Sequence, residues 1–351
     1  MAEDDPHRLA LEGLELDAVE AARLESLLES NPRDLDARTK LLGYYSQRSY
    51  ADASVRRRKT AHCLWTIRHR PEAEIAGTPF CQIQRFIDAA AYRKAKALWD
   101  KQVERHRKDT AVLANAAGFH TLDEKRTAIA ILKRLQRLEP RNPEWHERLG
   151  HLYHLQSGGG PGGKRNKAAA LRALEQWEKA LALLLTDSAR FYMLTQMAPV
   201  AVDAGRPRKA VRYAKELLRR AMKFRADWNH GNAVHYAHSA LGRVALRAKR
   251  MGEAKRHLIA SAKTKGSPQL NSFGPNQDLA AELLERGETT TVIRYLELCR
   301  AFWAMGQPQI DAWTKSILET GKTDFLPVFD SKPFLAQIPP YNVHPKGGNG
   351  N

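Results

Sequence analysis

Two histidine triplets with the same spacing come nearest to a chemical motif in this sequence. They are His146-x4-His151-x2-His154 and His230-x4-His235-x2-His238. Helical residues three apart share a face, so the last two histidines of each triplet could supply two metal ligands. A zinc site needs three or four ligands, and further ones would have to come from elsewhere. We therefore predict no metal site and expect histidines hydrogen-bonded within a helical stack, with binding of a partner or a metal as the open alternatives.

Two loops rich in Asn and Gly are the most unusual strings in the chain. They run from Asp227 to Asn232 and from Gly266 to Asn276. Turn chemistry alone accounts for such residues, and Asn232 and Asn276 are predicted helix N-caps. The alternative is a polar site where the loops meet beside the helix of His235 and His238. The candidate partner-binding residues are His151, His154, Trp228, Asn229, His230, His235, His238, Asn271 and Asn276.

The glycine-rich segment Ser157–Lys164 does not match the full sequence pattern of a phosphate-binding loop. Gly158-x4-Gly163-Lys164 fits the first part of the P-loop pattern, but Arg165 replaces the Ser or Thr that would hold Mg²⁺. No nucleophile motif is present, and Cys63 and Cys299 lie in apolar helical positions that predict buried, inert thiols. We predict a flexible linker at 157–164, name no catalytic residue and no cofactor, and leave an enzymatic role open.

The basic residues are concentrated in one part of the chain. The net charge is +18, and the segment 206–265 contains 17 Lys and Arg against three acidic residues. A helical spacing of three and four groups them into two rows, and the candidate anion-binding or nucleic-acid-binding residues are Arg208, Arg212, Lys215, Arg219, Arg243, Arg247 and Arg250. Solvated helix faces, an acidic protein partner and nucleic acid are the three interpretations.

The elements that carry these residues are expected to be helices throughout. Apolar residues recur at spacings of three and four, and the alternation typical of strands is lacking. Pro and Gly break the chain at points such as Asn31-Pro32, Glu139-Pro140 and Gly205-Arg206-Pro207. The sequence predicts about fifteen helical segments.

A repeat is visible in these segments. Residues 111–143 carry Ala114, Ala116 and Ala117 on a first helix, and a second helix that ends at Leu138-Glu139-Pro140. Thirty-four residues after Ala116 comes Gly150, within Leu149-Gly150-His151-Leu152-Tyr153. This pattern resembles the tetratricopeptide repeat (TPR), a 34-residue helix–turn–helix unit. The clearest repeats are 109–142, 143–186, 188–222 and 233–264, with weaker copies at 42–70, 82–106 and 275–303. The two loops rich in Asn and Gly also resemble strings in bacterial repeat proteins, a resemblance that implies no activity.

The resemblance implies an all-α, right-handed solenoid of about seven antiparallel helix pairs over residues 18–320, with a capping helix at 309–320. Such arrays present a concave groove, so the predicted function is that of an adaptor that binds a peptide or helix of a partner protein. The basic excess predicts an acidic partner. The alternatives are nucleic-acid association through 206–265, or a ligand, metal or catalytic site at 227–238 and 266–276.

Composition sets the remaining expectations. The longest apolar runs are too short for a membrane span, the acidic start has no secretory signal, and three cysteines cannot build a disulfide framework. We expect a cytoplasmic protein with no membrane partner. Residues 1–17 are predicted to be a flexible acidic N-terminus. Residues 321–351, rich in Pro and aromatics, are predicted to lie back on the body, with a mobile end.

Overall fold

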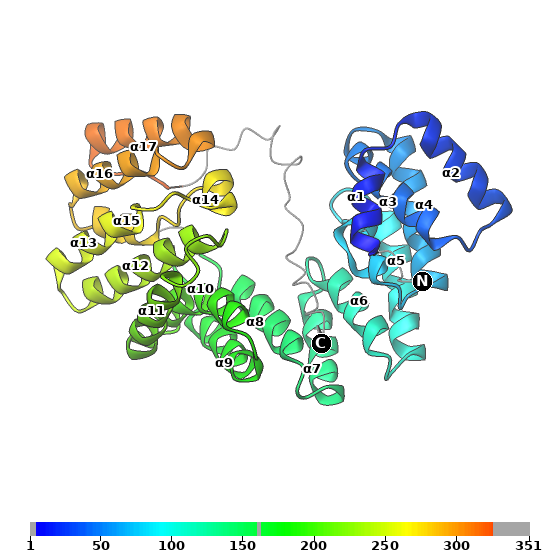
Figure 1. Ribbon diagram of the computed structural model, residues 1–351, viewed down its shortest axis with the longest axis horizontal. Helices are drawn as coiled ribbons and strands as arrows, with labels where there is room; N and C mark the ends of the chain where they lie inside the picture. Colours follow the sequence, from blue (N-terminus) through cyan, green and yellow to red (C-terminus); the bar gives the residue numbers. More distant parts are fainter. Residues whose placement is uncertain (1–4, 160–162, 326–351) are drawn as a thin grey trace. The chain divides into compact units, whose positions relative to one another are not determined.

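The computed structural model describes residues 5–159 and 163–325, which form two compact units that divide after Pro140. It confirms that the described chain is helical, with 17 α-helices, three short 3-10 turns and no strand in the described ranges (Figure 1). Among these helices, none has the length and apolar composition needed to cross a bilayer.

Unit 1 contains seven α-helices. They are α1 (Pro6–Leu14), α2 (Ala18–Ser30), α3 (Leu35–Ala51), α4 (Ala53–His69), α5 (Ala89–Arg105), α6 (Thr110–His120) and α7 (Lys125–Leu138), with 3-10 turns at Glu74–Gly77 and Pro79–Cys81. Six of the seven begin at an aspartate whose side chain accepts a hydrogen bond from a backbone N–H of the first turn: Asp5, Asp17, Asp34, Asp52, Asp88 and Asp109. These N-caps satisfy amides that would otherwise lack a partner. Part of the acidic character at the start of the chain therefore serves to define helix ends.

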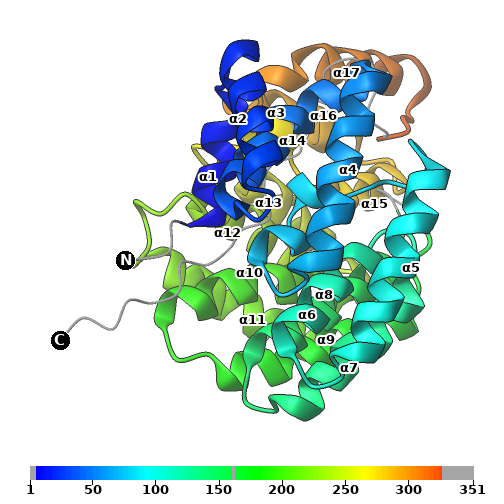
Figure 2. The same cartoon turned by 90° about the vertical axis from the view of Figure 1, so that its right-hand side faces the viewer.

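The N-terminal expectation is wrong for residues 6–14. They form α1, which buries Leu9 and Ala10 and packs against α3 (Figure 2). The two backbones touch, because a Cβ atom on Gly43 would lie 1.9 Å from the carbonyl oxygen of Ala10. The sequence 82–106, expected as a weak repeat, contains the single helix α5.

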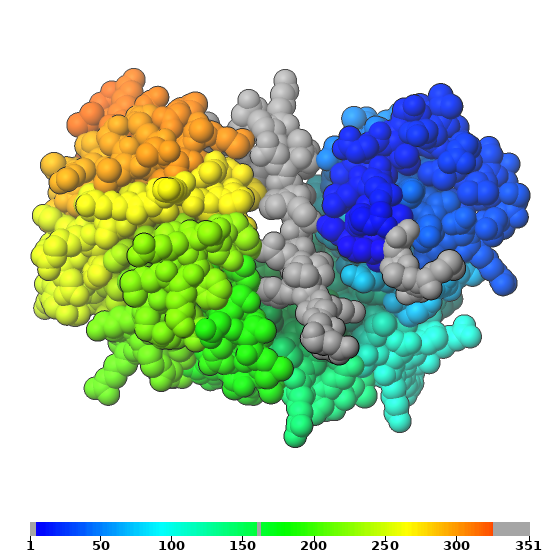
Figure 3. Space-filling model, viewed as in Figure 1, coloured from blue at the N-terminus to red at the C-terminus, as the bar shows by residue number. Residues whose placement is uncertain are grey.

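Unit 2 contains ten α-helices and one 3-10 turn, at Ala304–Gly306. The α-helices are α8 (Pro143–Ser157), α9 (Lys167–Leu183), α10 (Asp187–Asp203), α11 (Pro207–Ala221), α12 (His230–Arg247), α13 (Met251–Ser261), α14 (Pro268–Phe273), α15 (Asp278–Leu284), α16 (Thr289–Cys299) and α17 (Gln307–Thr320). Four helices of this unit have proline in their first turn, where the missing N–H is not needed: α8, α11, α14 and α17. The unit, green to orange, is continuously packed in space-filling view (Figure 3).

Neighbouring helices of unit 2 pack in pairs, α8 with α9, α10 with α11 and α12 with α13. Gly150 of α8 lies against the indole ring of Trp177 on α9, and a Cβ atom there would be 2.3 Å from Trp177 Nε1. Trp177 is itself fully buried. The glycine of the Leu-Gly-x-x-Tyr string therefore marks a close contact between α8 and α9.

The C-terminal tail is described only as far as Phe325. This residue is buried and packs edge-on against Trp313 of α17, with 5.2 Å between ring centroids. The rest of the predicted tail, 326–351, lies outside the described residues.

Candidate functional site

The two loops rich in Asn and Gly do meet, at the first turn of α12. Asn232 Nδ2 donates to Gln269 Oε1 at 3.0 Å, and Ser267 Oγ donates to Asn232 Oδ1 at 2.7 Å. Gly231 is needed at the crossing, because a Cβ atom there would be 1.9 Å from the carbonyl oxygen of Gly266. The loops are thus joined by buried side-chain hydrogen bonds.

Asn229 is not free to offer its amide to a ligand, which corrects the sequence-based expectation. Its side chain donates to Thr195 Oγ1 at 3.1 Å and accepts from Asn232 at 2.9 Å, and the residue is 3% exposed. Asn232 is not an N-cap either, because α12 begins at His230 and encloses it. Asn276 is not an N-cap either, because that position of α15 is Gln277, although the Asn276 Oδ1 accepts from the N–H of Asp278 at 3.0 Å. These amides stabilise the loops and do not offer a binding surface.

His235 connects three elements of unit 2. Its Nδ1 lies 3.1 Å from the carbonyl oxygen of Ser261, and its Nε2 lies 2.9 Å from the N–H of Asn276. Nδ1 must therefore carry the proton, and Nε2 must accept. Burial lowers the pKa of His235 to about 4, so the ring is neutral. This fully buried histidine is not available to a partner, contrary to its place among the candidates.

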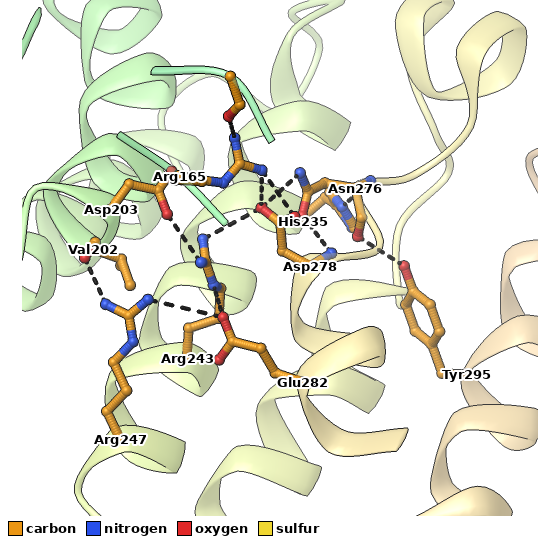
Figure 4. A network of polar contacts seen from close by, with 11 residues as sticks. Arg165, Val202, Asp203, His235, Arg243, Arg247, Asn276, Asp278, Glu282 and Tyr295 are labelled. Carbon is orange, nitrogen blue, oxygen red and sulfur yellow. Dashed lines mark hydrogen bonds and ion pairs between the residues drawn. The ribbon is translucent and has the colours of Figure 1, made fainter. Parts of the chain in front are cut away.

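A buried ionic network lies next to this histidine (Figure 4). Arg243 of α12, whose side chain is 5% exposed, contacts Asp203 at 2.9 Å, Glu282 at 2.8 Å and Asp278 at 3.3 Å. Burial disfavours its charged form, but the three carboxylates outweigh this effect and raise the pKa of Arg243. Arg243 is therefore an internal charge. Its assignment to a solvated basic row is wrong.

Arg165 is the second cation of the network. Its Nη2 lies 2.9 and 2.8 Å from the two carboxylate oxygens of Asp278, its Nε lies 3.3 Å from Asp203, and its Nη1 donates to the carbonyl oxygen of Gly158 at 3.0 Å. The residue that breaks the P-loop pattern thus ties the segment before α9 to α15. Burial raises the pKa of the Asp203 carboxyl, an effect that Arg243 and Arg165 partly oppose.

The α8 histidines pack against Trp177. The His151 and His154 rings lie 5.2 and 5.6 Å from its indole ring. His154 is the more enclosed, and burial lowers its pKa to about 4. Its Nδ1 is buried with no hydrogen-bond partner in the described ranges. On α12, His238 Nδ1 lies 3.0 Å from His257 Nδ1, and burial lowers the pKa of His238 to about 4. Over the described residues, His, Cys, Asp and Glu do not assemble into a group of three that could hold a metal ion.

Two of the nine candidate residues are exposed. Trp228 is 41% exposed and stacks on Tyr192 with 5.5 Å between ring centroids, and Asn271 is exposed on the second loop. The partly exposed candidates are His151, His154, His230, His238 and Asn276. Each loop therefore keeps one exposed candidate side chain, although the hydrogen-bonded amides between the loops are buried or partly buried.

The two predicted basic rows differ in their surroundings. Arg208, Arg212, Lys215 and Arg219 are all exposed on α11. In the α12 row, Arg243 is buried, Arg247 donates to the carbonyl oxygen of Val202 at 2.6 Å, and Arg250, just beyond the helix, pairs with Glu253 at 2.9 Å. All four cations on α11 are therefore exposed, whereas the α12 set combines the buried Arg243 with the exposed Arg247 and Arg250.

The network includes residues that the sequence did not single out. Asp203, Asp278 and Glu282 carry its negative charge, and Tyr295 donates to the carbonyl oxygen of Asn276 at 3.3 Å. Of these residues, only Asp278 lies close in the sequence to a feature that had been singled out, two positions after the second loop rich in Asn and Gly. Arg165 and Asp278 are 113 positions apart, and no motif spans that distance. The arrangement joins the segment before α9, the end of α10, α12 and α15 within unit 2.

A scan against protein-family models found no family that matches this chain, and a search of curated proteins found no significant relative.

Proposed function

We propose that this chain is a helical-repeat binding protein that holds an acidic segment of a partner protein. In this proposal the helix pairs are TPR-like repeats within a right-handed solenoid of about seven pairs, and the protein works in the cytoplasm. The bounds of α8–α9, α10–α11 and α12–α13 and the contact of Gly150 with Trp177 support the repeat interpretation. The side chains of Asn229, Asn232 and His235, which suggested chemistry, form hydrogen bonds within the protein, which favours binding over catalysis at the loops.

The exposed basic face of α11 is the observation that carries the proposal. Its four cations follow a spacing of four, three and four, and Met222, which is 62% exposed, continues the same row at the C-terminal end. The opposite face of α11 is buried through Ala210, Ala214 and Leu217. We call Arg208, Arg212, Lys215, Arg219 and Met222 the α11 row.

The α11 row is only partly neutralised by the protein itself. Arg219 pairs with Glu216 at 2.6 Å, and Arg212 lies over the ring of Tyr213. Arg208 and Lys215 have no ion-pair partner within the described ranges. A partner carboxylate can therefore approach these two cations without displacing an internal one.

The length of the α11 row defines the segment that fits it. Fourteen helical steps from Arg208 to Met222 span about 21 Å. A partner helix of about four turns, or an extended segment of about six residues, would cover it. The complementary sequence has acidic residues beside one apolar side chain that contacts Met222. Exposed charge pairs are screened by salt, so binding should weaken from 50 to 300 mM salt without disappearing.

The test is chemical crosslinking in the source cells, with three forms of the full-length protein. The first is the wild type, and the second carries R208E, R212E and K215E. The matched control carries K94E, K101E and R105E on α5, where all three residues are exposed and the change in net charge is equal. We expect one protein to be recovered with the wild type and the α5 variant, and at least tenfold less of it with the α11 variant.

Two outcomes would contradict the proposal. Equal recovery with the α11 variant would show that this surface does not bind the partner. Recovery of nuclease-sensitive material that is lost steeply at moderate salt would favour nucleic acid as the ligand of the same surface. Trp228, Lys223 and Arg225 lie exposed just beyond the α11 row, and an aromatic ring among cations is the arrangement that stacks single-stranded bases.

A further inference from the structure

Two of the three cysteines meet in the core of unit 1. Cys63 lies in the middle of α4, and Cys81 ends the 3-10 turn Pro79–Cys81. Both are buried, and the Cys81 Sγ lies 4.0 Å from the carbonyl oxygen of Cys63. The sequence alone shows an isolated cysteine in an apolar helix. The fold adds a second thiol as its direct neighbour.

The backbone around the pair is fixed from two sides. Lys59 Nζ donates to the carbonyl oxygen of Gln82 at 3.3 Å, which holds the segment after Cys81 against α4. The Gln82 side chain donates to the carbonyl oxygen of Phe119 at 3.0 Å, which holds the same segment against α6. The two sulfur atoms are therefore kept together by the tertiary structure.

The two thiols are not equivalent. Burial raises the pKa of each, but the hydrogen bond from Cys81 and the charge of Lys59 bring the pKa of Cys63 below its ordinary value. The same hydrogen bond, together with burial, raises the pKa of Cys81. Cys63 is therefore the thiol that ionises first, and the thiolate is the form that reacts. Cys299, in unit 2, differs because burial raises its pKa to about 12, although Tyr295 opposes this.

A small surface cleft adjoins the pair. It is lined by residues that include Thr60, one helical turn before Cys63, and Pro79 and Gln82, which flank Cys81. Ser49, Tyr50 and Lys59 are among the polar residues of its wall. The wall is formed by neighbours of the two cysteines and by neither cysteine itself, so a peroxide has to pass this wall to reach the pair.

We propose that Cys63 and Cys81 are a modification site that forms a reversible disulfide with a peroxide as oxidant. The Cys63 thiolate attacks one peroxide oxygen, the O–O bond breaks, and the released hydroxide takes a proton to become water. The Cys81 sulfur then attacks the Cys63 sulfur of the sulfenic acid, the S–O bond breaks, and the hydroxide leaves with the Cys81 proton as a second water. The thiols lose two electrons and the peroxide gains them. A dithiol reductant returns both thiols by exchange.

The test uses the full-length, reduced protein and hydrogen peroxide. After the peroxide is removed with catalase, the protein is unfolded and alkylated with N-ethylmaleimide. Its mass is then measured by mass spectrometry. The number of alkylated thiols is expected to fall from three to one, the peptide map is expected to link Cys63 to Cys81, and dithiothreitol is expected to restore all three. Cys299→Ser is the matched control and should leave the rate of linkage unchanged.

Two variants separate the steps. In Cys81→Ser the disulfide cannot form, and the sulfenic acid at Cys63 should be trapped by dimedone. In Cys63→Ser neither product should appear. The proposal is overturned if the wild type keeps three alkylated thiols under conditions that oxidise free glutathione, or if the link that forms involves Cys299. The wild-type peptide map decides the matter even if a variant does not fold.

Discussion

Replacement of Arg243 by methionine should destabilise unit 2 strongly. Arg243 is the closest cation to Asp203, at 2.9 Å, and also contacts Glu282 and Asp278. Without it, Asp203 keeps Arg165 at 3.3 Å, and Glu282 keeps Arg247 at 3.8 Å. The Asp203 side chain is 4% exposed, so water cannot replace the lost cation. Breaking a buried pair in this way costs about 3–5 kcal/mol.

The pKa of Asp203 determines how the cost of Arg243→Met changes with pH. Burial already raises the pKa of Asp203, and Arg243 is the largest influence that lowers it. The variant should raise this pKa further, so that folded Asp203 takes up a proton more readily than unfolded Asp203. Stability from such a group is present at low pH and is lost as the pH rises through the folded pKa. The loss of stability caused by the substitution should therefore be smaller at pH 5 than at pH 8. The difference is about 1.4 kcal/mol for each unit of the rise in the Asp203 pKa that lies between these two pH values.

The assay is urea unfolding followed by circular dichroism at both pH values. Arg250→Met is the control, since Arg250 is exposed and, among the residues that the structure describes, forms an ion pair only with Glu253, and a surface pair is worth less than about 1 kcal/mol. If the two units unfold separately, only the transition of unit 2 should move. A loss below about 1 kcal/mol for Arg243→Met, or a loss equal at both pH values, would refute a buried network.

Three further predictions concern packing, protonation and binding. Gly150→Val should cost about 1–3 kcal/mol by overpacking against Trp177, visible as a lower denaturation midpoint; an unchanged midpoint would mean that the helix pair can separate. Wild-type stability should fall as the pH drops from about 6.5 to about 4. Burial lowers the pKa of His154, His235 and His238 to about 4, so in this range the unfolded state binds protons that the folded state does not. His235→Asn, which keeps an N–H for the Ser261 oxygen, should flatten this dependence, and an unchanged slope would show that His235 does not titrate there. Trp228→Ala should change stability by less than about 0.5 kcal/mol, since the ring is largely at the surface, yet weaken capture of the partner; equal capture would place binding elsewhere.

The helical architecture follows directly from local sequence. Proline in the first turn and aspartate at N-caps define helix starts, and Ala116 and Gly150, 34 residues apart, fall on α6 and α8. The contact of Gly150 with Trp177 has the same origin, because a glycine within an apolar helical stripe is needed only where another group comes close. These signals are local, which is why a single sequence reveals them.

The buried charges could not be predicted in the same way. Arg243, Arg247 and Arg250 have the spacing of an exposed basic row, as on α11. However, α12 is packed by α10, α11, α13 and α15, so one position of its row points inward. The acids that neutralise Arg243 come from α10 and α15, which only the tertiary fold brings together. The N-terminal helix was missed for a related reason, since the partner of its small apolar face is Gly43 on α3.

Zero-length crosslinking of the recovered partner to this chain shows directly whether the α11 row binds an acidic segment. A carbodiimide joins a lysine to a carboxylate only when the two are in contact. We expect bonds from Lys215, within the α11 row, or from Lys223, immediately beyond it, to Asp or Glu of the partner, with a lower yield at 300 than at 50 mM salt. Bonds that come only from lysines on other helices, such as Lys94 or Lys101 on α5, would contradict it.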